Sequence, residues 1–480
     1  MTGGQRRAVE DAPVLLCFRQ DLRLHDNEAL AAAVLSGRQV LPVFIHENEG
    51  TWRWGAASRW WLHHSLTSLA RDLSARGLAL RIAQGEASDR LFELANEVGA
   101  TAVYWNRRYE PDAAAKDEGV IADLATHGVK VHEHSGYLLQ EPGALKTGSG
   151  GPYQVFTPYY KKFLQTKRRE EVVPLPSIAP NQKLSAGSCD LDALALLPKR
   201  DWAEGLRATW SPGEAGARAA LDCFLSQGLT KYDSQRDLPN LEGTSRLSAH
   251  LHWGEISPLV VWQAAESAAP TAGAPFLRQL VWREFAHHLL HHFPQTTEAP
   301  LRPQFLAFSW DGDPTLLTAW QRGETGYPFV DAGMRQLWAT GWMHNRVRMV
   351  AASFLVKHLL LPWQAGAEWF WDTLVDANLA NNTFGWQWTA GCGADAAPYF
   401  RIFNPITQGK RFDTQGDYIR RWVPELAKLP LKLLHEPWLG DESEMLACGV
   451  RLGRDYPRPI VVHAEARQRA LDTYQRMRLG

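Results

Sequence analysis

Short apolar runs alternate with helix-compatible segments through the first part of the chain. Residues 14–18, Val-Leu-Leu-Cys-Phe, are followed by a polar loop and by an Ala-rich stretch at 28–35 with the character of a helix. The same order then repeats, which predicts strands at 40–45, 79–82, 102–105 and 130–132 and helices at 57–76, 87–98 and 112–126. This alternation is typical of an open parallel sheet with helices on both faces, so we expect a Rossmann-like α/β domain over residues 12–134.

Sheets of this kind bind ligands beyond the carboxyl ends of their strands. The loops after Phe18, Ile45 and Trp105 are therefore candidate walls of a ligand site. The chain contains neither a G-x-G-x-x-G motif nor a Walker loop, so we do not predict a dinucleotide bound in the usual Rossmann manner. Two interpretations of this domain stay open, a scaffold without a ligand and a ligand-binding domain.

The regular pattern ends near residue 135. Gly148–Gly151 and several prolines interrupt residues 135–201, which predicts a long interdomain connector, and the aromatic and basic segment 153–169 within it is compatible with a helix. From 202 to 480 the strand signal disappears, and helices are predicted at 275–292, 313–322, 330–339, 346–360, 363–375 and 464–478. The C-terminal domain should therefore be all-α.

Length and charge narrow the class of protein. At 480 residues the chain is longer than one hydrophobic core usually supports, which agrees with two or more domains. Its 51 Lys and Arg nearly balance its 52 Asp and Glu, so a strongly basic nucleic-acid-binding chain is excluded. Any contact with nucleic acid must come from a local patch.

Cysteine usage and the N-terminal segment indicate in which cellular compartment the protein is found. The five cysteines are scattered without a C-x-x-C pair, which argues against a disulfide framework and against a zinc ribbon. No apolar run approaches the roughly 18 residues of a membrane span, and the N-terminus lacks the apolar core of a signal peptide. We therefore expect a cytoplasmic protein without a membrane contact.

The most informative stretch is residues 376–388. It crowds a carboxylate, several amides and two indoles into one short segment. Amides can meet the heteroatoms of a ring while indoles cover its faces, so this mixture favours a flat aromatic cofactor with polar edges. Arg348 shares a helical face with Asn345 and is a natural partner for Asp376. For each indole, packing in a core is the alternative.

Two other segments carry polar groups suited to ligands. Residues 243–248, Gly-Thr-Ser-Arg-Leu-Ser, combine hydroxyls with a guanidinium ahead of a helix, which favours an anion such as phosphate; a capped helix start is the alternative. The pairs His287/His291 and His288/His292 have the i, i+4 spacing of metal ligands. No acidic or cysteine partner lies nearby in the sequence, so a polar helix face is favoured and no metal is predicted.

The chain resembles the photolyase and cryptochrome flavoproteins in several long motifs. These run in the order of the family through nearly the whole chain, and they are Phe18–Arg23, Gly243–Ser248, Gly326–Pro328, Gly341–Met349 and Arg401–Pro405. The resemblance implies an α/β antenna domain, a connector and an all-α domain that binds FAD. It further implies a carbon-carbon lyase, in which light drives an electron from reduced FAD into a cyclobutane pyrimidine dimer in DNA. A cryptochrome-type blue-light photoreceptor with little or no repair activity is the alternative.

The resemblance also assigns roles residue by residue. The positions that match FAD-binding residues are Tyr232, Thr244, Ser245, Arg246, Leu247, Ser248, Arg283, Asn345, Arg348, Asp376, Asn378 and Asn382. The positions that match the tryptophan chain carrying electrons to the flavin are Trp386, Trp363 and Trp310. The positions that match the wall for the dimer and the DNA contacts are Arg236, Gln279, Trp282, Asn345, Arg346, Met349 and Trp388. The resemblance implies a catalytic part for Asn382 beside the flavin and for Gln279 beside the dimer.

A few positions bear on the choice within the family. Asn382 stands where plant cryptochromes have Asp, and a neutral amide that cannot supply a proton favours the anionic reduced flavin that repair needs. Asn345 argues against a six-four photolyase, which has His in this region. Gln279 replaces a Glu common in repair enzymes, and Asn378 replaces the second Asp of an Asp-x-Asp-Leu pattern, so these two departures favour the photoreceptor. Repair of cyclobutane dimers is the better reading.

The antenna and the partners follow from the same resemblance. Segments 58–62 and 208–213 resemble the bacterial photolyases closest to plant cryptochromes, which implies methenyltetrahydrofolate as antenna. Ala113 stands where the enteric folate-binding pattern has Glu, and an 8-hydroxy-deazaflavin is the alternative. The expected partner is DNA that contains pyrimidine dimers, and the expected state is a monomer.

Overall fold

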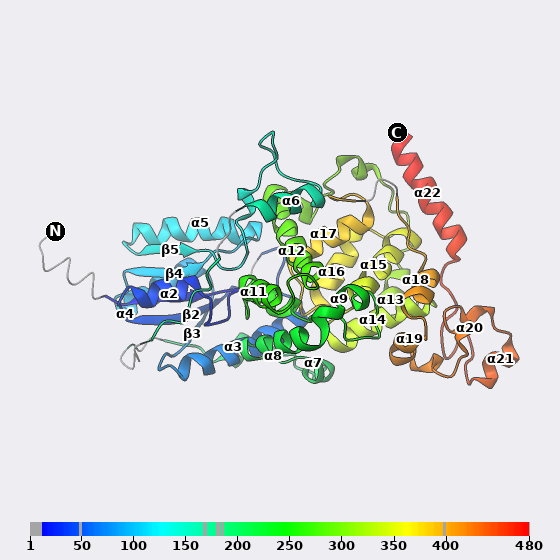
Figure 1. The fold of residues 1–480 in the computed structure, drawn as a ribbon, viewed down its shortest axis with the longest axis horizontal. Coiled ribbons are helices and arrows are strands. Elements are labelled where there is room, and N and C mark those ends of the chain that lie inside the picture. Colours follow the sequence, from blue (N-terminus) through cyan, green and yellow to red (C-terminus); the bar gives the residue numbers. More distant parts are fainter. Residues whose placement is uncertain are drawn as a thin grey trace, which may run out of the picture.

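The protein has an α/β part at the N-terminal end and a larger helical part that follows it (Figure 1). The computed structural model describes residues 12–479, except 48–49, 167–169, 179–183, 185–186 and 397–399.

The α/β part is built on a five-stranded parallel sheet. Its strands are β1 (Val14–Phe18), β2 (Val40–His46), β3 (Arg81–Gln84), β4 (Ala102–Asn106) and β5 (Lys130–His134). They are ordered β3-β2-β1-β4-β5, with Val14 opposite both Val40 and Ala102. Because the winding reverses between β1 and β4, the loops after these two strands open at a switch point, where such sheets bind ligands. The predicted open parallel sheet is confirmed.

Helices cover both faces of this sheet. They are α2 (Glu28–Leu35), α3 (Ala56–Ser74), α4 (Ala87–Val98) and α5 (Pro111–Thr126). Leu16 and Phe18 share a hydrophobic cluster with α2 and α3, while Leu15 and Cys17 share one with α4 and α5. The separation arises because successive side chains of a strand point to opposite faces.

The third strand differs from its prediction. It begins at Arg81 rather than at residue 79, because its pairing with β2 starts at Val43 and Arg81. A strand at the edge of a sheet is delimited by its one neighbour, and the apolar pattern does not contain that information.

Short helices occupy the described parts of the connector. They are η1 (Pro142–Ala144), α6 (Phe156–Gln165) and η2 (Leu191–Leu194). The helix predicted within 153–169 corresponds to α6, and residues 167–169 lie outside the described residues. The division of the chain at 134/135 and 201/202 stays a prediction.

The helical part contains many helices, most of them short. They are α7 (Glu204–Thr209), α8 (Glu214–Cys223), η3 (Phe224–Gly228), η4 (Leu229–Lys231), α9 (Tyr232–Gln235), α10 (Ser248–His252), α11 (Pro258–Ala268), α12 (Ala274–His292), η5 (Pro294–Thr297), η6 (Pro303–Ala307), α13 (Leu316–Arg322), α14 (Pro328–Thr340), α15 (Asn345–Ser353), η7 (Phe354–His358), α16 (Trp363–Thr373), α17 (Leu379–Ala390), α18 (Pro405–Phe412), α19 (Asp417–Trp422), η8 (Pro424–Leu426), α20 (Leu431–Leu434), η9 (Pro437–Leu439), α21 (Glu442–Ala447) and α22 (His463–Leu479). Among the described residues of this part no strand forms, so the all-α prediction is confirmed.

The predicted helix at 346–360 forms, but its second half is not a regular α-helix. Regular α-helix ends at Ser353, and the chain continues as the π-helical turn η7. Lys357 in this turn is buried, and its Nζ donates to the carbonyl oxygen of Ala390 at 2.6 Å, at the end of α17. A π turn holds one more residue than an α turn, so apolar periodicity cannot show where it occurs.

Buried polar contacts join the two parts of the molecule. Glu255 is fully buried and accepts a hydrogen bond from Nε1 of Trp61 in α3 at 2.9 Å. The guanidinium of Arg23 donates to the carbonyl oxygen of Gly254 at 2.9 Å. Gly254 has a φ of 64°, and a Cβ there would lie 2.1 Å from the carbonyl oxygen of Gln20. Only glycine fits this close approach of the two parts.

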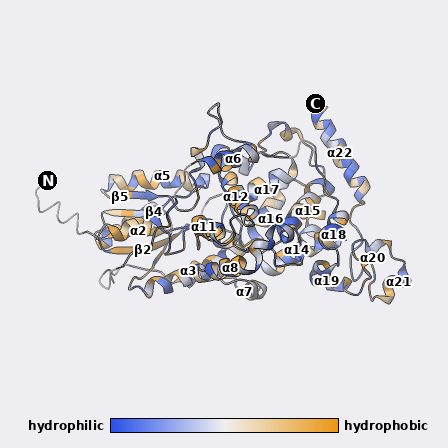
Figure 2. Ribbon diagram, in the orientation of Figure 1, coloured by the Kyte–Doolittle hydropathy of each residue, from blue (hydrophilic) through white to orange (hydrophobic). Residues whose placement is uncertain are grey.

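The strands and the inner helices carry most of the apolar residues, whereas α22 is largely hydrophilic (Figure 2). In the described part of the chain, no helix combines the length and the apolar character that crossing a bilayer requires.

Buried histidines predict a loss of stability in acid. Burial is the main cause that lowers the pKa of each of these side chains to about 3 or about 4, and they are His252, His287, His288, His344 and His358. Below about pH 6.5 the unfolded chain therefore takes up protons that the folded chain does not bind. Each of these histidines lowers the free energy of unfolding by up to about 1.4 kcal/mol per pH unit, between about pH 6.5 and about pH 4.

Two buried carboxyl groups oppose this effect. Burial raises the pKa of Glu284 to about 7 and that of Asp331 to about 6, so the folded chain binds these protons first. The histidines outnumber them, and we expect the melting temperature to fall between about pH 7 and about pH 5. Replacing His358 by Gln should weaken this dependence, whereas replacing the exposed His127 by Gln should leave it unchanged. A melting temperature that is flat over this range would contradict the prediction.

Candidate functional site

The centre of the candidate site is the carboxylate of Asp376, between α16 and α17. It is buried, and Nη2 of Arg348 from α15 donates to its two oxygens at 3.1 and 2.9 Å. Ser248, at the start of α10, donates from Oγ to Oδ2 of Asp376 at 2.6 Å. The predicted pairing of Arg348 with Asp376 is confirmed, and its use for a flavin stays a prediction. Three helices of the helical part therefore meet at one buried charge.

Asn378 uses both ends of its amide within the protein. Its Oδ1 accepts from the N–H of Asn381 at 3.1 Å, which caps α17, as expected of Asn at a helix start. Its Nδ2 donates to Oη of Tyr137 at 3.2 Å and faces Nε2 of His287 at 3.5 Å. The position at which the chain departs from the family pattern is therefore a structural link to the connector and to α12.

Arg283 and His287 form a buried group with Tyr137. Nη1 of Arg283 donates to the carbonyl oxygen of Tyr137 at 3.1 Å, and the guanidinium lies 4.5 Å from the centre of the Tyr137 ring. Nδ1 of His287 lies 2.9 Å from the carbonyl oxygen of Arg283 and donates to it. Burial, and then the charge of Arg283, lower the pKa of His287 to about 3, so this ring is neutral.

Of the paired histidines predicted to form a polar face of α12, His291 is exposed and His292 is half-buried. His287 and His288 are buried. Nδ1 of His288 donates to the carbonyl oxygen of Pro142 at 2.8 Å, and its Nε2 accepts from the N–H of Tyr153 at 3.1 Å. Among the described residues, no group of three potential metal ligands occurs. These rings attach α12 to the connector.

Replacing Asn378 by Asp should destabilise the protein at neutral pH. Asp caps a helix as well as Asn does, so the substitution isolates the two contacts of Nδ2. A carboxylate oxygen would face Nε2 of His287, which carries no proton because Nδ1 is the donor to Arg283. We expect a loss of about 1–3 kcal/mol in the free energy of unfolding, partly regained in acid as His287 is protonated. Urea unfolding at two pH values measures this effect.

The matched control is Asn381→Asp on the exposed side of the same helix start, which should change stability little. If the Asn378→Asp variant and the wild type are equally stable at neutral pH, the Nδ2 contacts contribute nothing to the free energy of unfolding.

The segment 243–248 lies beside this centre but does not act as one unit. Leu247 is buried, and its N–H donates to Oγ of Ser245 at 3.4 Å. Arg246 has a φ of 56°; its Nη2 lies 3.1 Å from Glu242, and its guanidinium lies 3.7 Å from the centre of the Trp342 ring. The predicted anion-binding charge is therefore paired with a carboxylate.

The remaining predicted FAD-binding positions lie nearby. Tyr232 is buried and packs edge-on against Phe224 and Phe276, and Thr244 is half-buried. Asn382 of α17 donates from Nδ2 to the carbonyl oxygen of Ala367 in α16 at 3.0 Å.

His252 shows that the donor set fits a polar-edged ligand. The ring is 1 % exposed, and neither nitrogen has a hydrogen-bond partner in the described part of the protein. Asp376 and Arg283 are the charges that act on it, so it lies at the junction of the two groups above. Buried ring nitrogens are almost always hydrogen-bonded, and FAD supplies both donors and acceptors. The sequence analysis missed His252; its place directly after the segment 243–248 was the available signal.

Two indoles form the proposed wall for the dimer. Trp282 of α12 stacks on Phe156, with ring centres 3.5 Å apart and planes 7° apart. Trp388 of α17 donates from Nε1 to the carbonyl oxygen of Asp395 at 3.1 Å. Both indoles are half-buried. Gln279 lies one helical turn before Trp282, and its Nε2 donates to the carbonyl oxygen of Pro275 at 3.2 Å.

The other positions predicted to contact DNA lie on α15 and at the end of α9. Arg346 is paired with Asp237 at 2.7 Å, and its guanidinium lies 4.5 Å from the centre of the Phe412 ring. Asn345 and Met349 contact each other on α15, with Nδ2 3.9 Å from the sulfur. Arg236, half-buried, lies over the ring of Tyr232 at 5.5 Å. A phosphate at Arg346 would therefore compete with Asp237.

The three tryptophans assigned to electron transfer belong to one core region. Trp386 and Trp363 are buried in it, and Trp310 packs against it with part of its surface exposed. Trp386 lies on Gly366, where a Cβ would come within 2.0 Å of the indole. It also makes an edge-to-face contact with Trp320, with ring centres 6.2 Å apart. The sequence analysis did not single out Trp320, because its position depends on how α13 packs against α17.

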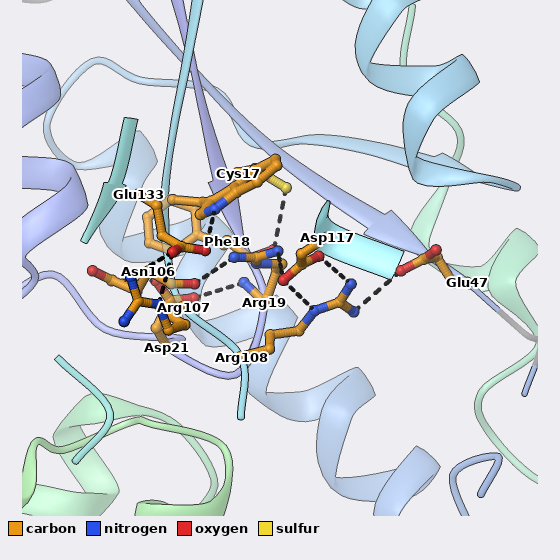
Figure 3. Close-up of polar contacts among 11 residues, drawn as sticks. Cys17, Phe18, Arg19, Asp21, Glu47, Asn106, Arg107, Arg108, Asp117 and Glu133 are labelled. Carbon is orange, nitrogen blue, oxygen red and sulfur yellow. Dashed lines mark hydrogen bonds and ion pairs between the residues drawn. The ribbon is translucent and has the colours of Figure 1, made fainter. Parts of the chain in front are cut away.

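A second pocket opens in the α/β part, at the carboxyl ends of β1, β2 and β4. Residues from all three predicted loops line it, including Arg19, Glu47 and Arg108. Figure 3 shows Arg19 and Arg108 pointing to Asp117, at 2.7 and 2.6 Å. Burial disfavours the charge of Arg108, but Asp117 and Glu47 raise its pKa above the ordinary value. The expectation of a site at these strand ends is supported by this pocket.

Burial also shifts the pKa of two further groups in this pocket. Burial raises the pKa of the Cys17 thiol to about 12, so this cysteine is not a nucleophile at neutral pH. Burial also raises the pKa of Glu110, whose Oε1 accepts from Nε2 of Gln20 at 3.4 Å. A carboxyl held in this way can bind the donor edge of a heteroaromatic ring.

Comparisons with known proteins agree on both parts of the chain. A family model described as DNA photolyase matches residues 14–180, and one described as the FAD binding domain of DNA photolyase matches residues 276–476. A deoxyribodipyrimidine photo-lyase of Agrobacterium fabrum is 48% identical and aligns over 97% of this chain and 98% of its own. Cryptochrome-2 of Arabidopsis thaliana is 38% identical over 95% of this chain and 78% of its own.

A solved structure agrees with these matches over the whole fold. The crystal structure of a bacterial class III photolyase from Agrobacterium tumefaciens has a TM-score of 0.95 and 47% sequence identity, and 98% of each chain is covered.

Proposed function

This chain belongs to the photolyase and cryptochrome family, and we propose that it is a light-driven lyase that repairs cyclobutane pyrimidine dimers in DNA. The helical part contains the FAD-binding domain of this family. Support for repair comes from relatives named as photo-lyases, one of them 48% identical. Bound FAD, once reduced and excited by light, supplies the electron that splits the dimer.

The chain's own residues would hold the cofactor from three sides. We assign the group of Arg348, Asp376 and Ser248 to one edge of the flavin, and His252 to a polar contact that no atom of the described residues makes. Asn382 is oriented by its bond to Ala367, and its amide can hydrogen-bond but cannot transfer a proton. This neutral environment favours the anionic reduced state over protonation of the flavin.

The assignment to DNA repair rests on the placement of Trp282 and Trp388. Two half-buried indoles on the neighbouring helices α12 and α17 can receive bases that have left the stack of a duplex. Gln279, one turn from Trp282, can donate to or accept from a pyrimidine edge. Arg236 and Arg346 can bind the flanking phosphates, so binding should weaken as salt rises.

The test is light-dependent repair of an oligonucleotide that contains one cyclobutane thymine dimer. With a reductant and blue light we expect loss of the dimer, and no loss in the dark. Trp388→Ala should impair the binding of damaged DNA by about tenfold while bound flavin is retained. The exposed Trp202, ahead of the first helix of the helical part, provides the matched control, Trp202→Ala. A protein that is photoreduced normally but leaves the dimer intact would instead be a photoreceptor.

The antenna chromophore is proposed to bind in the pocket of the α/β part. The carboxyl of Glu110 suits the donor edge of a pterin, and Arg108 and Lys116 suit the acidic tail of a folate. Methenyltetrahydrofolate is therefore preferred, with 8-hydroxy-deazaflavin as the alternative.

An exposed pair of parallel indoles offers a competing location for the antenna. Trp338 and Trp369 have ring centres 5.9 Å apart and planes 3° apart, and Trp338 is 65 % exposed. The absorption spectrum of purified protein identifies the chromophore. If the pocket is its site, Glu110→Gln lowers the antenna content and Trp338→Ala does not; the reverse result moves the site to the indole pair.

We further propose that the protein works as a monomer in the cytoplasm. None of its five cysteines is paired in the structure, which suits a reducing compartment. Light scattering on the eluting protein measures the oligomeric state.

A further inference from the structure

Asp395 lies between the two indoles of the proposed dimer wall and contacts the supports of both. Its carbonyl oxygen accepts from Nε1 of Trp388 at 3.1 Å. Its Oδ1 accepts from the N–H of Phe156 at 3.1 Å, and its own N–H donates to the carbonyl oxygen of Gln154 at 3.1 Å. One residue therefore joins the end of α17 to the start of α6 in the connector.

Phe156 carries this contact on to Trp282. The phenyl ring is buried and lies face to face with the Trp282 indole, 3.5 Å between centres. It also contacts Tyr160, at 5.6 Å, Phe285, at 5.7 Å, and the guanidinium of Arg278, at 5.4 Å. Phe156 is thus held between the connector helix and α12, against which α6 packs (Figure 1). A shift of Phe156 must move Trp282.

The carboxylate of Asp395 acts as a cap on a helix that has none of its own. Val155 occupies the cap position of α6 without a side-chain hydrogen bond, while Asp395 binds the first N–H of that helix. A carboxylate is favourable at this end of a helix because the first N–H groups have no partner within it. The bond therefore fixes where α6 begins relative to α17.

The segment that carries Asp395 is itself held against α17. The N–H groups of Cys392 and Gly393 both donate to the carbonyl oxygen of Gln387 at 3.1 Å. Asp395 has a φ of 50°, a left-handed conformation that Asp tolerates better than most residues. The backbone ahead of Asp395 is therefore anchored to the end of α17.

We propose that Asp395 is a positioning residue that sets the spacing of Trp282 and Trp388, and thereby the affinity for DNA that contains a dimer. It does so without contact to the lesion, through the chain Trp388, Asp395, Phe156 and Trp282. This inference rests on the proposed function of the two indoles.

Two substitutions separate the carboxylate from the backbone conformation. Asp395→Gly permits the left-handed φ but removes the acceptor, whereas Asp395→Asn permits this φ and keeps an acceptor oxygen. We expect the Kd for dimer-containing DNA to rise about five- to tenfold in Asp395→Gly and to stay within about twofold in Asp395→Asn. Bound flavin and the affinity for undamaged DNA should not change in either variant. A Kd in Asp395→Gly equal to that of the wild type would overturn the proposal.

A second measurement does not depend on DNA. In protein labelled with fluorotryptophan, the ¹⁹F resonance of Trp282 should shift in Asp395→Gly and not in Asp395→Asn, while that of Trp202 stays constant in both. An unchanged Trp282 resonance would overturn the positioning role. If the wild type neither binds nor repairs dimers, the proposed function fails, and the ¹⁹F result still decides whether Asp395 positions Trp282.

Coupling between the two indoles is tested by a double-mutant cycle. Trp388→Phe removes the indole N–H that binds Asp395. If Asp395 links both walls, the loss of affinity caused by Asp395→Gly should be smaller in the Trp388→Phe background than in the wild type. Strictly additive losses would show that the two indoles are positioned independently and would overturn the link.

Discussion

Asp376→Asn is expected to weaken FAD binding by about 30-fold, the equivalent of about 2 kcal/mol. This carboxylate is the ion-pair partner of Arg348, and it also accepts a hydrogen bond from Ser248. Removing one partner of a buried pair leaves the other charge without compensation, at a cost of about 3–5 kcal/mol. We expect less here because the Arg348 side chain is 23 % exposed to solvent. Flavin absorbance per protein after gel filtration measures the effect.

Two matched variants show whether the charge is responsible. Ser248→Ala removes one hydrogen bond from Asp376 but keeps the ion pair, and it should reduce flavin binding by about fivefold. Asp237→Asn removes a carboxylate of similar kind from the more exposed pair with Arg346, and flavin content should be unaffected. Wild-type flavin content in Asp376→Asn would place the cofactor elsewhere.

Trp386→Phe is expected to slow photoreduction of the flavin by more than about tenfold while the flavin stays bound. A phenyl ring gives up an electron far less readily than an indole, and the difference greatly exceeds the 1.4 kcal/mol that a tenfold rate change represents. Trp386 is 2 % exposed and is held by Gly366 on one side, so Phe fits the space with little rearrangement. Flash absorption spectroscopy of the oxidised protein measures the rate.

The next member of the chain can be identified in the same experiment. The family resemblance assigns Trp363, whereas the structure shows an edge-to-face contact of Trp386 with Trp320. We expect Trp363→Phe to slow photoreduction nearly as much as Trp386→Phe, and Trp320→Phe to slow it less. Trp438→Phe, remote in the core beside Tyr327, serves as control. Chemically reduced Trp386→Phe protein should still repair dimers, and a normal photoreduction rate in that variant would remove Trp386 from the chain.

Elements with strong local patterns were predictable from the sequence almost to the residue. The strand Val14–Phe18 and the helix Ala87–Val98 have the predicted bounds, because an apolar run between polar segments and a helical periodicity are properties of the segment itself. The π turn at Phe354–His358 was not predictable. It depends on Lys357 reaching the end of α17, a contact between segments that are far apart in the sequence.

The same distinction between local pattern and long-range contact applies to the candidate site. Arg348 and Asp376 could be paired from sequence because a guanidinium is a natural partner for a carboxylate and the family resemblance assigns both to one site. His252 and Asp395 escaped notice, since an isolated His or Asp has no distinctive pattern. Their importance arises from burial without a partner in one case and from three contacts to two distant segments in the other.

The sequence by itself determined the class of this protein: a parallel α/β part, an all-α part and the family motifs that identify a flavoprotein acting on DNA. These features depend on local periodicity and on residue identity, which the chain carries directly. Only the tertiary structure decided how the site is assembled. The stacking of Trp282 on Phe156 and the place of His252 beside Asp376 and Arg283 are set by packing between segments far apart in sequence, and no local pattern encodes that packing.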